Sequence, residues 1–381
     1  MREHTEGTTV RIIIAGGGTG GHLFVGIALA ETLRAKEPEN RILFVVTKRE
    51  LEASLLQKRG FGSKGITIEG LKGRSLSHQV RALFKIPFSL AQAIRIIRDF
   101  RADLVIGVGG YSSGPVVLAA HFLGIRTAVH EQNFVPGLTN RILAHFVDQV
   151  FVSFGESIPF FPEEKTKVTG NPVRRELFTE YRIEKTGNRF TILILGGSQG
   201  AHSINMAVIG ALDHLKEEVS RLFFIHQTGA KDFEWVMRAY KERNVSAEVN
   251  PFIEDMARAY RVSDLVISRA GATTIAELTA LGKAAILIPF PFATNNHQER
   301  NARFLSEGGA ADLILETELD GHLLAKRIIY YVNHPDILQS VEEKARSKGK
   351  TDAADLIVDD LLGEEKRSKP RGRTTYSNGL R

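Results

Sequence analysis

A histidine closes a glycine-rich turn near the start of the chain. The turn is Gly16-Gly-Gly-Thr-Gly-Gly21, it follows an apolar run at Val10–Ala15, and His22 comes directly after it. Backbone N–H groups of such a turn, at the start of a helix, can hold an anion. Because an imidazole has an unperturbed pKa of about 6.5, it is the side chain best suited to take up a proton near neutral pH. We therefore expect His22 to be a general base beside an anion-binding loop.

The glycine pattern alone does not identify the ligand. A dinucleotide site needs an acidic residue at the end of the second strand, where it binds the ribose hydroxyls. This chain has the basic pair Lys48-Arg49 there instead. That pair would suit the extra phosphate of NADP, so an NADP-dependent oxidoreductase is an alternative interpretation. Against it, the second half of the chain has no feature that indicates a hydride acceptor.

Polar residues also follow two other strand candidates in the first half. The segment His130-Glu-Gln-Asn133 ends one apolar run, and Gly109-Gly-Tyr111 follows another. The carboxyl ends of parallel strands meet at one edge of a sheet, so these side chains are expected to face a cleft. Glu131 is a second candidate for the general base, and Gln132 is expected only to cap the loop. The expected acceptor-side residues are Asn133, Tyr111 and Asn140.

In the second half, Ser268-Arg-Ala-Gly-Ala-Thr-Thr-Ile-Ala-Glu277 again ends a strand and opens a helix. The free N–H groups at Ala272–Thr274 and the helix dipole would receive a diphosphate. Glu277 is placed to accept hydrogen bonds from both hydroxyls of a ribose, and Gln298 and Asn301 to read sugar hydroxyls. No Asp-X-Asp occurs in the sequence, so we expect no metal and no cofactor at this site.

The elements that carry these residues alternate between apolar β-rich runs and helical patterns, which is typical of parallel sheets covered by helices. The succession of a strand, a glycine-rich turn and a helix start occurs twice, at Arg11–Gly21 and at Thr191–Ala201. This predicts an α/β fold with two Rossmann-like domains facing a cleft. The expected domains are 1–170 and 171–349, joined near Phe161–Pro172, with a last helix at about 350–363 that crosses back onto the first domain. The expected strands are Val10–Ala15, Ile42–Val46, Leu104–Val108, Thr127–His130, Gln149–Val152, Thr191–Leu195, Leu222–Gln227, Leu265–Ser268 and Ala284–Pro289.

Composition limits the class of protein. The chain has 381 residues, 43% of them hydrophobic, and it contains no cysteine. That length suits two domains, and the lack of cysteine excludes disulfides, thiolate catalysis and cysteine-bound metals. No apolar stretch reaches the roughly 20 residues of a membrane span. We expect a cytoplasmic protein that is either soluble or peripheral to a membrane.

Two segments account for the net charge of +6. The tail at 364–381 is basic and polar, which is typical of solvated disorder. The segment Leu71–Arg101 carries seven basic residues against Asp99 alone. Its first apolar run, Leu76–Phe84, is expected to dock on an anionic membrane surface, and the second, beginning at Phe88, to be a buried helix. Because the rest of the chain is mildly acidic, we expect no nucleic-acid partner.

Several separate loops together resemble the MurG family, the undecaprenyl-diphospho-muramoylpentapeptide N-acetylglucosaminyltransferases of peptidoglycan synthesis. The resemblance extends from about residue 10 to residue 350. Its motifs are Gly-Gly-Thr-Gly-Gly-His at 17–22, Gly-Gly-Tyr at 109–111, His-Glu-Gln-Asn at 130–133, Gly-Asn-Pro-Val-Arg at 170–174, Gly-Gly-Ser-Gln-Gly-Ala at 196–201, Ser-Arg-Ala-Gly-Ala at 268–272 and His-Gln at 297–298. Val25 and Ser112 depart from the family pattern on the acceptor side, where proline and valine are usual.

The resemblance implies a GT-B fold and a metal-independent, inverting transfer of N-acetylglucosamine from UDP-N-acetylglucosamine to lipid I. By similarity, Thr19, Gly20, Gly21 and Asn133 line the acceptor domain. Residues implied for the donor are Arg174, Ser198, Ile253, Ala272, Thr273, Thr274, Ile275, Ala276, Glu277 and Gln298. Another GT-B enzyme, either a lipid glycosyltransferase or a UDP-N-acetylglucosamine epimerase, remains an alternative, as does a basic adaptor without catalytic activity.

Overall fold

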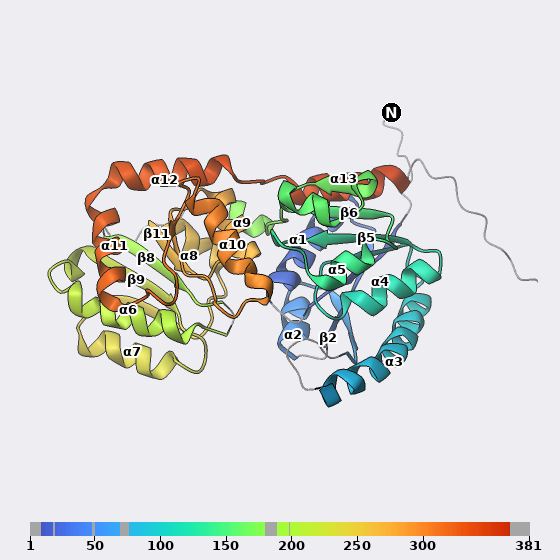
Figure 1. The fold of residues 1–381 in the computed structure, drawn as a ribbon, viewed down its shortest axis with the longest axis horizontal. Coiled ribbons are helices and arrows are strands. Elements are labelled where there is room, and N and C mark those ends of the chain that lie inside the picture. The colour runs from blue at the N-terminus through green and yellow to red at the C-terminus, as the bar shows by residue number, and fades with distance from the viewer. Residues whose placement is uncertain are drawn as a thin grey trace, which may run out of the picture.

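The structure is a computed structural model that describes residues 9–17, 20–47, 50–68, 76–179, 189–197 and 199–365. Two parallel sheets form the centres of two domains that lie side by side (Figure 1). Within these ranges no helix combines the length and apolar character that crossing a bilayer requires. The predicted α/β architecture with two doubly wound sheets is confirmed.

The N-terminal sheet has seven strands in the order β3-β2-β1-β4-β5-β6-β7. Ile12, Ile13 and Ile14 of the central strand have no exposed surface, because helices cover both faces of the sheet. Such strands consist of continuous apolar runs, which made most of them predictable. Their bounds are β1 Arg11–Ala15, β2 Arg41–Thr47, β3 Gly62–Ile66, β4 Leu104–Gly107, β5 Arg126–Glu131, β6 Gln149–Val152 and β7 Thr166–Val168.

The C-terminal sheet has six strands in the order β10-β9-β8-β11-β12-β13, the same arrangement without the last strand. In each sheet the strands are added first to one side of the first strand, β1 or β8, and then to its other side. Ligands bind at such a topological switch point in doubly wound folds. The strands are β8 Phe190–Leu195, β9 Leu222–Gln227, β10 Ala247–Asn250, β11 Leu265–Ser268, β12 Ala285–Leu287 and β13 Asp312–Leu313.

Helices cover both faces of each sheet (Figure 1). Those of the N-terminal domain are α1 Gly20–Lys36, α2 Glu50–Lys58, α3 Leu76–Phe100, α4 Ser113–Phe122 and α5 Leu138–Leu143. Those that follow in the chain are α6 His202–His214, α7 Phe233–Glu242, α8 Met256–Val262, α9 Ala272–Leu281, α10 His297–Ser306, α11 Gly321–Asn333, α12 Pro335–Ser347 and α13 Ala353–Glu365.

The last helix returns to the first domain. Figure 1 shows α12 on the C-terminal domain leading to α13 beside α1. Ile357, Val358 and Leu361 of α13 are fully buried in the same apolar cluster as β1 and α1. Gln149 on β6 donates a hydrogen bond of 2.7 Å to Asp360. The two domains are therefore joined by two separate stretches of chain.

Two details differ from the sequence-based expectations. The expected linker contains β7, which pairs with β6 and belongs to the N-terminal sheet. Phe88 was expected to be buried, yet 57% of it is exposed, because α3 continues through Pro87 and turns this side chain to the surface. Ile97, one turn before the end of the same helix, is buried as expected.

Candidate active site

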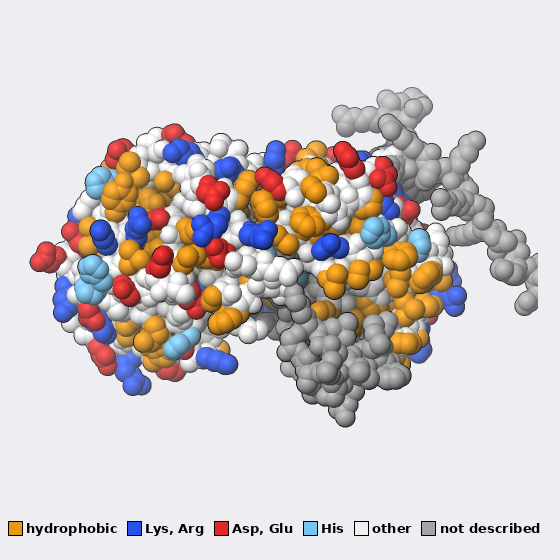
Figure 2. Space-filling view, viewed as in Figure 1, with side chains coloured by type: hydrophobic (Ala, Val, Ile, Leu, Met, Phe, Trp, Pro, Cys, Tyr) orange, Lys and Arg blue, Asp and Glu red, His pale blue; other side chains and the backbone are white. Residues whose placement is uncertain are grey.

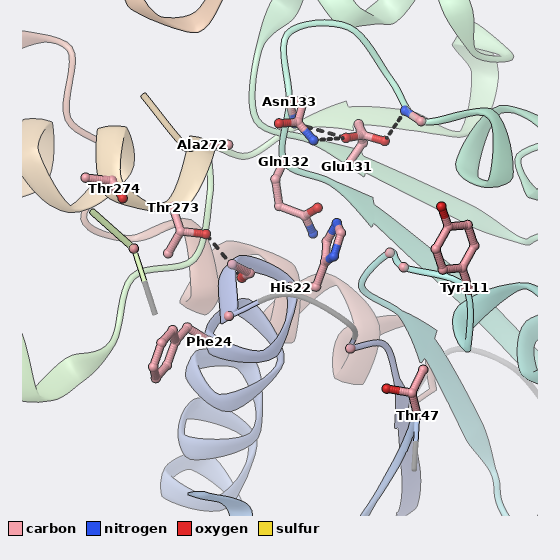
Figure 3. A pocket seen from close by; sticks show the side chains of 18 of the residues that line it. His22, Phe24, Thr47, Tyr111, Glu131, Gln132, Asn133, Ala272, Thr273 and Thr274 are labelled. Atoms are coloured by element: carbon pink, nitrogen blue, oxygen red, sulfur yellow. Dashed lines mark hydrogen bonds between the residues drawn. The ribbon is translucent and has the colours of Figure 1, made fainter. Parts of the chain in front are cut away.

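A cleft of about 1790 Å³ lies between the two domains. Its walls come from the turns that follow β1, β4 and β5 in the N-terminal domain and β8, β9 and β11 in the C-terminal domain. These are the carboxyl ends of both sheets, where a doubly wound fold places its ligands. Figure 3 shows side chains from both domains turned toward this space.

His22 lies in the first turn of α1 and lines the cleft. Burial and, to a smaller extent, the nearby His297 of the other domain lower its pKa to about 4. The ring packs against Gly109, where an added methyl group would be only 2.7 Å from the His22 Cδ2 atom. The imidazole is therefore neutral at physiological pH and has a nitrogen lone pair that can accept a proton.

Glu131, the second candidate base, is 2% exposed at the end of β5. Its Oε1 atom accepts hydrogen bonds from the backbone and side-chain nitrogens of Asn133, at 3.0 and 3.1 Å. Its Oε2 atom accepts from the Gly137 backbone at 3.0 Å and from Asn140 at 2.9 Å. Burial raises the pKa of this carboxyl, and the four donors oppose that rise. Three of these donors come from the following loop and the fourth from α5, so Glu131 holds the loop in shape against this helix.

The remaining acceptor-side residues lie along the same wall. Asn133 is partly buried beside Gln132, and Tyr111 is 48% exposed. Both line the cleft together with Gly20, Gly21 and Asn140 (Figure 3). Asn140 is itself almost fully buried, because it supports the carboxylate of Glu131 and the His130 carbonyl. Its position indicates a structural contribution to this wall.

The N-terminus of α9 faces the first domain across the cleft. No side chain in the described part of the chain caps this helix, and Ile275 is the first residue whose N–H group bonds back, to the Gly271 carbonyl. The N–H groups of the first turn therefore point toward the cleft without partners inside the helix. Thr273 donates a hydrogen bond of 3.1 Å to the Gly21 carbonyl, which places the two helix starts opposite one another (Figure 3).

Glu277 is buried one turn further along α9 and is paired with a cation. Arg174 donates to its Oε1 atom from Nη2 at 2.8 Å and from Nε at 3.2 Å, and the Tyr260 hydroxyl donates to Oε2 at 3.0 Å. The Arg174 guanidinium also lies 4.3 Å from the ring centre of Phe24 on α1. A carboxylate can accept about four hydrogen bonds, so Oε2 keeps capacity for a ligand hydroxyl.

Gln227, at the end of β9, joins two parts of the donor wall. Its Nε2 atom donates to the Gly197 carbonyl in the glycine-rich turn at 2.8 Å. Its Oε1 atom accepts from the Ile253 backbone at 2.9 Å. The Ile253 N–H group is therefore occupied by Gln227, and the Ile253 carbonyl is the backbone group that can accept a hydrogen bond from a nucleotide base. Sequence reasoning missed Gln227, although its place after a predicted strand was the available signal.

Gln298 and Asn301 differ in their position on α10. Gln298 lines the cleft and accepts a hydrogen bond of 2.9 Å from the Phe290 backbone. Asn301 is fully buried and accepts from the Phe134 backbone at 3.3 Å, so it joins the domains and does not face the cleft space. Its predicted contact with a sugar hydroxyl is therefore not supported by the structure.

Not every expected donor residue faces the cleft. Ile275 is 3% exposed in the core of the C-terminal domain, and Ala276 packs against that core, because the fourth and fifth positions of α9 turn inward. Thr19 and Ser198 lie outside the described residues. Ala272, Thr273, Thr274, Glu277, Ile253 and Arg174 all line the cleft. Within the described ranges no cluster of three or more histidines and acidic residues is arranged to hold a metal.

Comparison with known proteins places this cleft in a family. A profile of the glycosyltransferase family 28 N-terminal domain matches residues 12–152, and that of the C-terminal domain matches residues 191–357. A protein of Syntrophus aciditrophicus (strain SB), 53% identical over 93% of this chain and 98% of its own, is named UDP-N-acetylglucosamine--N-acetylmuramyl-(pentapeptide) pyrophosphoryl-undecaprenol N-acetylglucosamine transferase. The chain belongs to the MurG family within glycosyltransferase family 28.

Solved structures agree with this membership. The crystal structure of Acinetobacter baumannii MurG superposes with a TM-score of 0.72 at 32% identity, covering 93% of this chain and 99% of that one. A putative UDP-N-acetylglucosamine 2-epimerase from Listeria monocytogenes reaches a TM-score of 0.69 at 12% identity, with 95% and 98% covered. The similarity to the epimerase shows the shared fold alone. The MurG resemblance expected from the motifs is confirmed by the sequence identity to the transferase and by the MurG crystal structure.

Proposed function

We propose that this protein transfers N-acetylglucosamine from UDP-N-acetylglucosamine to the C4 hydroxyl of N-acetylmuramic acid in undecaprenyl-diphospho-muramoylpentapeptide, which is lipid I. The products are lipid II and UDP. The observation that carries the proposal is the 53% identity, over nearly the whole chain, with a transferase named for this donor and acceptor. The cleft supports it, since its two walls suit a nucleotide on one side and a hydroxyl acceptor on the other.

His22 is the general base of the proposed mechanism. Its ring is neutral at physiological pH because burial lowers its pKa to about 4. It takes the proton from the acceptor hydroxyl as the oxygen attacks the anomeric carbon from the face opposite the diphosphate, which inverts the configuration. Glu131 has a different task, because four hydrogen bonds already engage its carboxylate. It shapes the loop that receives the acceptor.

The first turn of α9 binds the diphosphate of the donor. Its uncapped N–H groups and the helix dipole stabilise the negative charge that develops on UDP as the sugar leaves. Glu277 accepts a hydrogen bond from the ribose on its remaining Oε2 capacity. Arg174 pairs with Glu277 and holds this carboxylate in place, and Gln298 lies at the sugar end of the cleft.

An anionic membrane surface is the proposed docking partner of the N-terminal domain. The apolar run expected for it, Leu76–Phe84, has side chains outside the described residues. The neighbouring helices and the turn after α5 expose a set that we call the apolar face: Phe88, Phe122, Leu138, Ile142 and Phe146. Figure 2 shows hydrophobic side chains gathered on this domain.

The apolar face is continuous with the mouth of the cleft. Leu138 is 69% exposed and Ile142 is 52% exposed, and both also line the cleft. A lipid-linked acceptor therefore reaches the cleft along this face while its chain stays in the bilayer. Flotation with vesicles containing phosphatidylglycerol tests this: Phe122→Ser with Leu138→Ser should weaken binding. Met206→Ser, on an equally exposed residue of the other domain, should not.

The activity is tested by measuring UDP release from UDP-N-acetylglucosamine in EDTA, with and without a short-chain lipid I analogue. Release that requires the acceptor, with the disaccharide product identified by mass spectrometry, is the expected result. Release without any acceptor, together with formation of the 2-epimer, would replace the proposal with an epimerase. UDP binding without turnover on this acceptor would also contradict it.

A further inference from the structure

Gln132 is a buried glutamine whose amide orientation is fixed by its neighbours. It is 2% exposed, and its Nε2 atom lies 2.8 Å from the Val108 carbonyl, 3.2 Å from His130 Nδ1 and 3.3 Å from the His130 carbonyl. Backbone carbonyls only accept hydrogen bonds, so the NH₂ group must be the one that faces them. The amide oxygen therefore points the other way.

That oxygen faces the ring of His22. The Oε1 atom of Gln132 is buried and accepts no hydrogen bond within the described part of the chain. A methyl group placed on Gly109 would lie 3.4 Å from this oxygen and 2.9 Å from His22 Nε2. Figure 3 shows the amide and the imidazole pointing toward one another. Gly109 has a φ of 92° and no side chain, so nothing from this residue separates them.

We propose that Gln132 is a positioning residue for His22. Its Oε1 atom accepts the Nε2–H of the neutral imidazole, which selects one tautomer and leaves Nδ1 as the atom that accepts a proton. A buried amide oxygen without a hydrogen bond is unfavourable, which favours formation of this contact. The inference rests on the proposed role of His22 as the base.

The proposed contact also serves the reaction step. As the acceptor oxygen bonds to the anomeric carbon, its proton moves to His22 Nδ1, and the electron pair of the sugar–phosphate bond leaves with UDP. The resulting imidazolium keeps its Nε2–H on Gln132. A hydrogen bond from a charged donor is stronger than one from a neutral donor, so the amide stabilises the product of proton transfer more than the starting state.

The neighbouring ionisable groups fit this arrangement. His130 carries its proton on Nε2, where it contacts the Gly170 carbonyl at 3.0 Å, because its Nδ1 accepts from Gln132. His297 faces His22 from α10 and disfavours a positive charge there. The Glu131 carboxylate is turned into its own loop. Gln132 therefore links the buried His130 to His22 through defined donors and acceptors.

The tautomer of His22 is measurable by NMR. Long-range ¹H–¹⁵N correlation spectra of protein labelled in its histidines distinguish the two tautomers, and His22→Ala identifies the signal. The wild type should show the Nε2–H form. Gln132→Met, which fills the space without an acceptor, should give a mixture, whereas Gln132→Glu keeps an acceptor and should keep the Nε2–H form. Gln149→Met, which removes another buried glutamine of the same sheet, should leave the spectrum of His22 unchanged.

Turnover gives the second measurement. Gln132→Met should lower kcat about 10-fold or more, at the lower end of what general-base assistance contributes, with the KM for UDP-N-acetylglucosamine unchanged. Gln132→Glu should retain more activity than Gln132→Met. An Nδ1–H tautomer in the wild type, or the same tautomer in both Gln132 variants, would overturn the proposal. Absence of transfer by the wild type would refute the proposed function instead. The NMR spectra would still test the contact between Gln132 and His22, because they do not depend on turnover.

Discussion

The two walls of the cleft differ in whether their buried ionisable groups are paired with an opposite charge. In the N-terminal wall, burial lowers the pKa of His22 and His130 to about 4 and raises that of Glu131, and no cation among the described residues pairs with that carboxylate. In the C-terminal wall, buried Glu277 is paired with Arg174 at 2.8 Å. The first wall therefore favours neutral groups that can exchange a proton. The second holds fixed charges and helix N–H groups, which suits binding of a charged donor.

The largest expected effect separates chemistry from binding. His22→Ala should lower kcat by about 10²- to 10⁴-fold, because it removes the proposed base. The KM for UDP-N-acetylglucosamine should stay close to that of the wild type, since the donor wall is unchanged. Steady-state kinetics measure both constants, and His214→Ala on the exposed end of α6 is a control. Full activity in His22→Ala would show that proton transfer does not depend on this wall.

On the opposite wall, Glu277→Ala should mainly weaken nucleotide binding and lower stability. The change leaves Arg174 buried without its main partner, and breaking a buried ion pair costs about 3–5 kcal/mol. Calorimetric titration with UDP and denaturant unfolding measure the two effects. Glu277→Gln keeps an acceptor for Tyr260 and should bind UDP better than Glu277→Ala. A loss of kcat without a change in UDP affinity would contradict the division between the walls.

Acid should destabilise the protein through its buried neutral histidines. Burial lowers the pKa of His130 to about 4 and that of His226 to about 3. The unfolded chain then binds more protons below pH 6.5, so stability is complete above that pH and is lost as the pH falls toward these values. Between pH 7 and pH 5 each such group should lower the free energy of unfolding by about 2 kcal/mol.

Unfolding in urea at several pH values measures this loss. His226 is buried on β9, does not line the cleft and bonds to Asn205 and Tyr240. His226→Gln should therefore reduce the pH dependence of unfolding without shifting the pH profile of kcat. A wild-type stability that does not change between pH 7 and pH 5 would show that these histidines are not held neutral.

A smaller effect is expected from Gln227, which shapes the donor wall without carrying a charge. Gln227→Ala removes the hydrogen bonds to Gly197 and Ile253, each worth about 0.5–1.5 kcal/mol. The KM for UDP-N-acetylglucosamine should rise up to about 10-fold with kcat little changed. Gln227→Glu keeps the acceptor for Ile253, so its KM for UDP-N-acetylglucosamine should lie between those of the wild type and Gln227→Ala. An equally large rise in the KM for the lipid acceptor would contradict the assignment of Gln227 to the donor wall.

Buried strands were readable from the sequence, and edge strands were not. The expected Gln149–Val152 and Leu265–Ser268 match β6 and β11 residue for residue, because both faces of these strands are covered and their runs are apolar. The missed strands β3, β7, β10 and β13 lie at or near the edges of the sheets. Lys64 and Lys167 show why: such strands are half exposed and lack a continuous apolar run.

Individual roles were less predictable than positions. His22, Glu131 and Glu277 all line the cleft, as their places after strands indicated. The sequence treated Glu131 as an alternative base and Gln132 as a cap. In the structure the Glu131 carboxylate is saturated by four donors, and the oxygen of Gln132 has none among the residues that the structure describes. Saturation depends on where a loop folds, which a local pattern does not specify.

The sequence by itself determined two parallel sheets, their glycine-rich turns and the residues at the carboxyl ends of the strands. Those features follow from local rules, since apolar periodicity defines strands and helices and glycine permits tight turns. The tertiary structure alone decided that His22 is neutral and that Glu277 is paired with Arg174. Both depend on burial and on partners brought from distant segments, because protonation and pairing respond to the whole surroundings of a group.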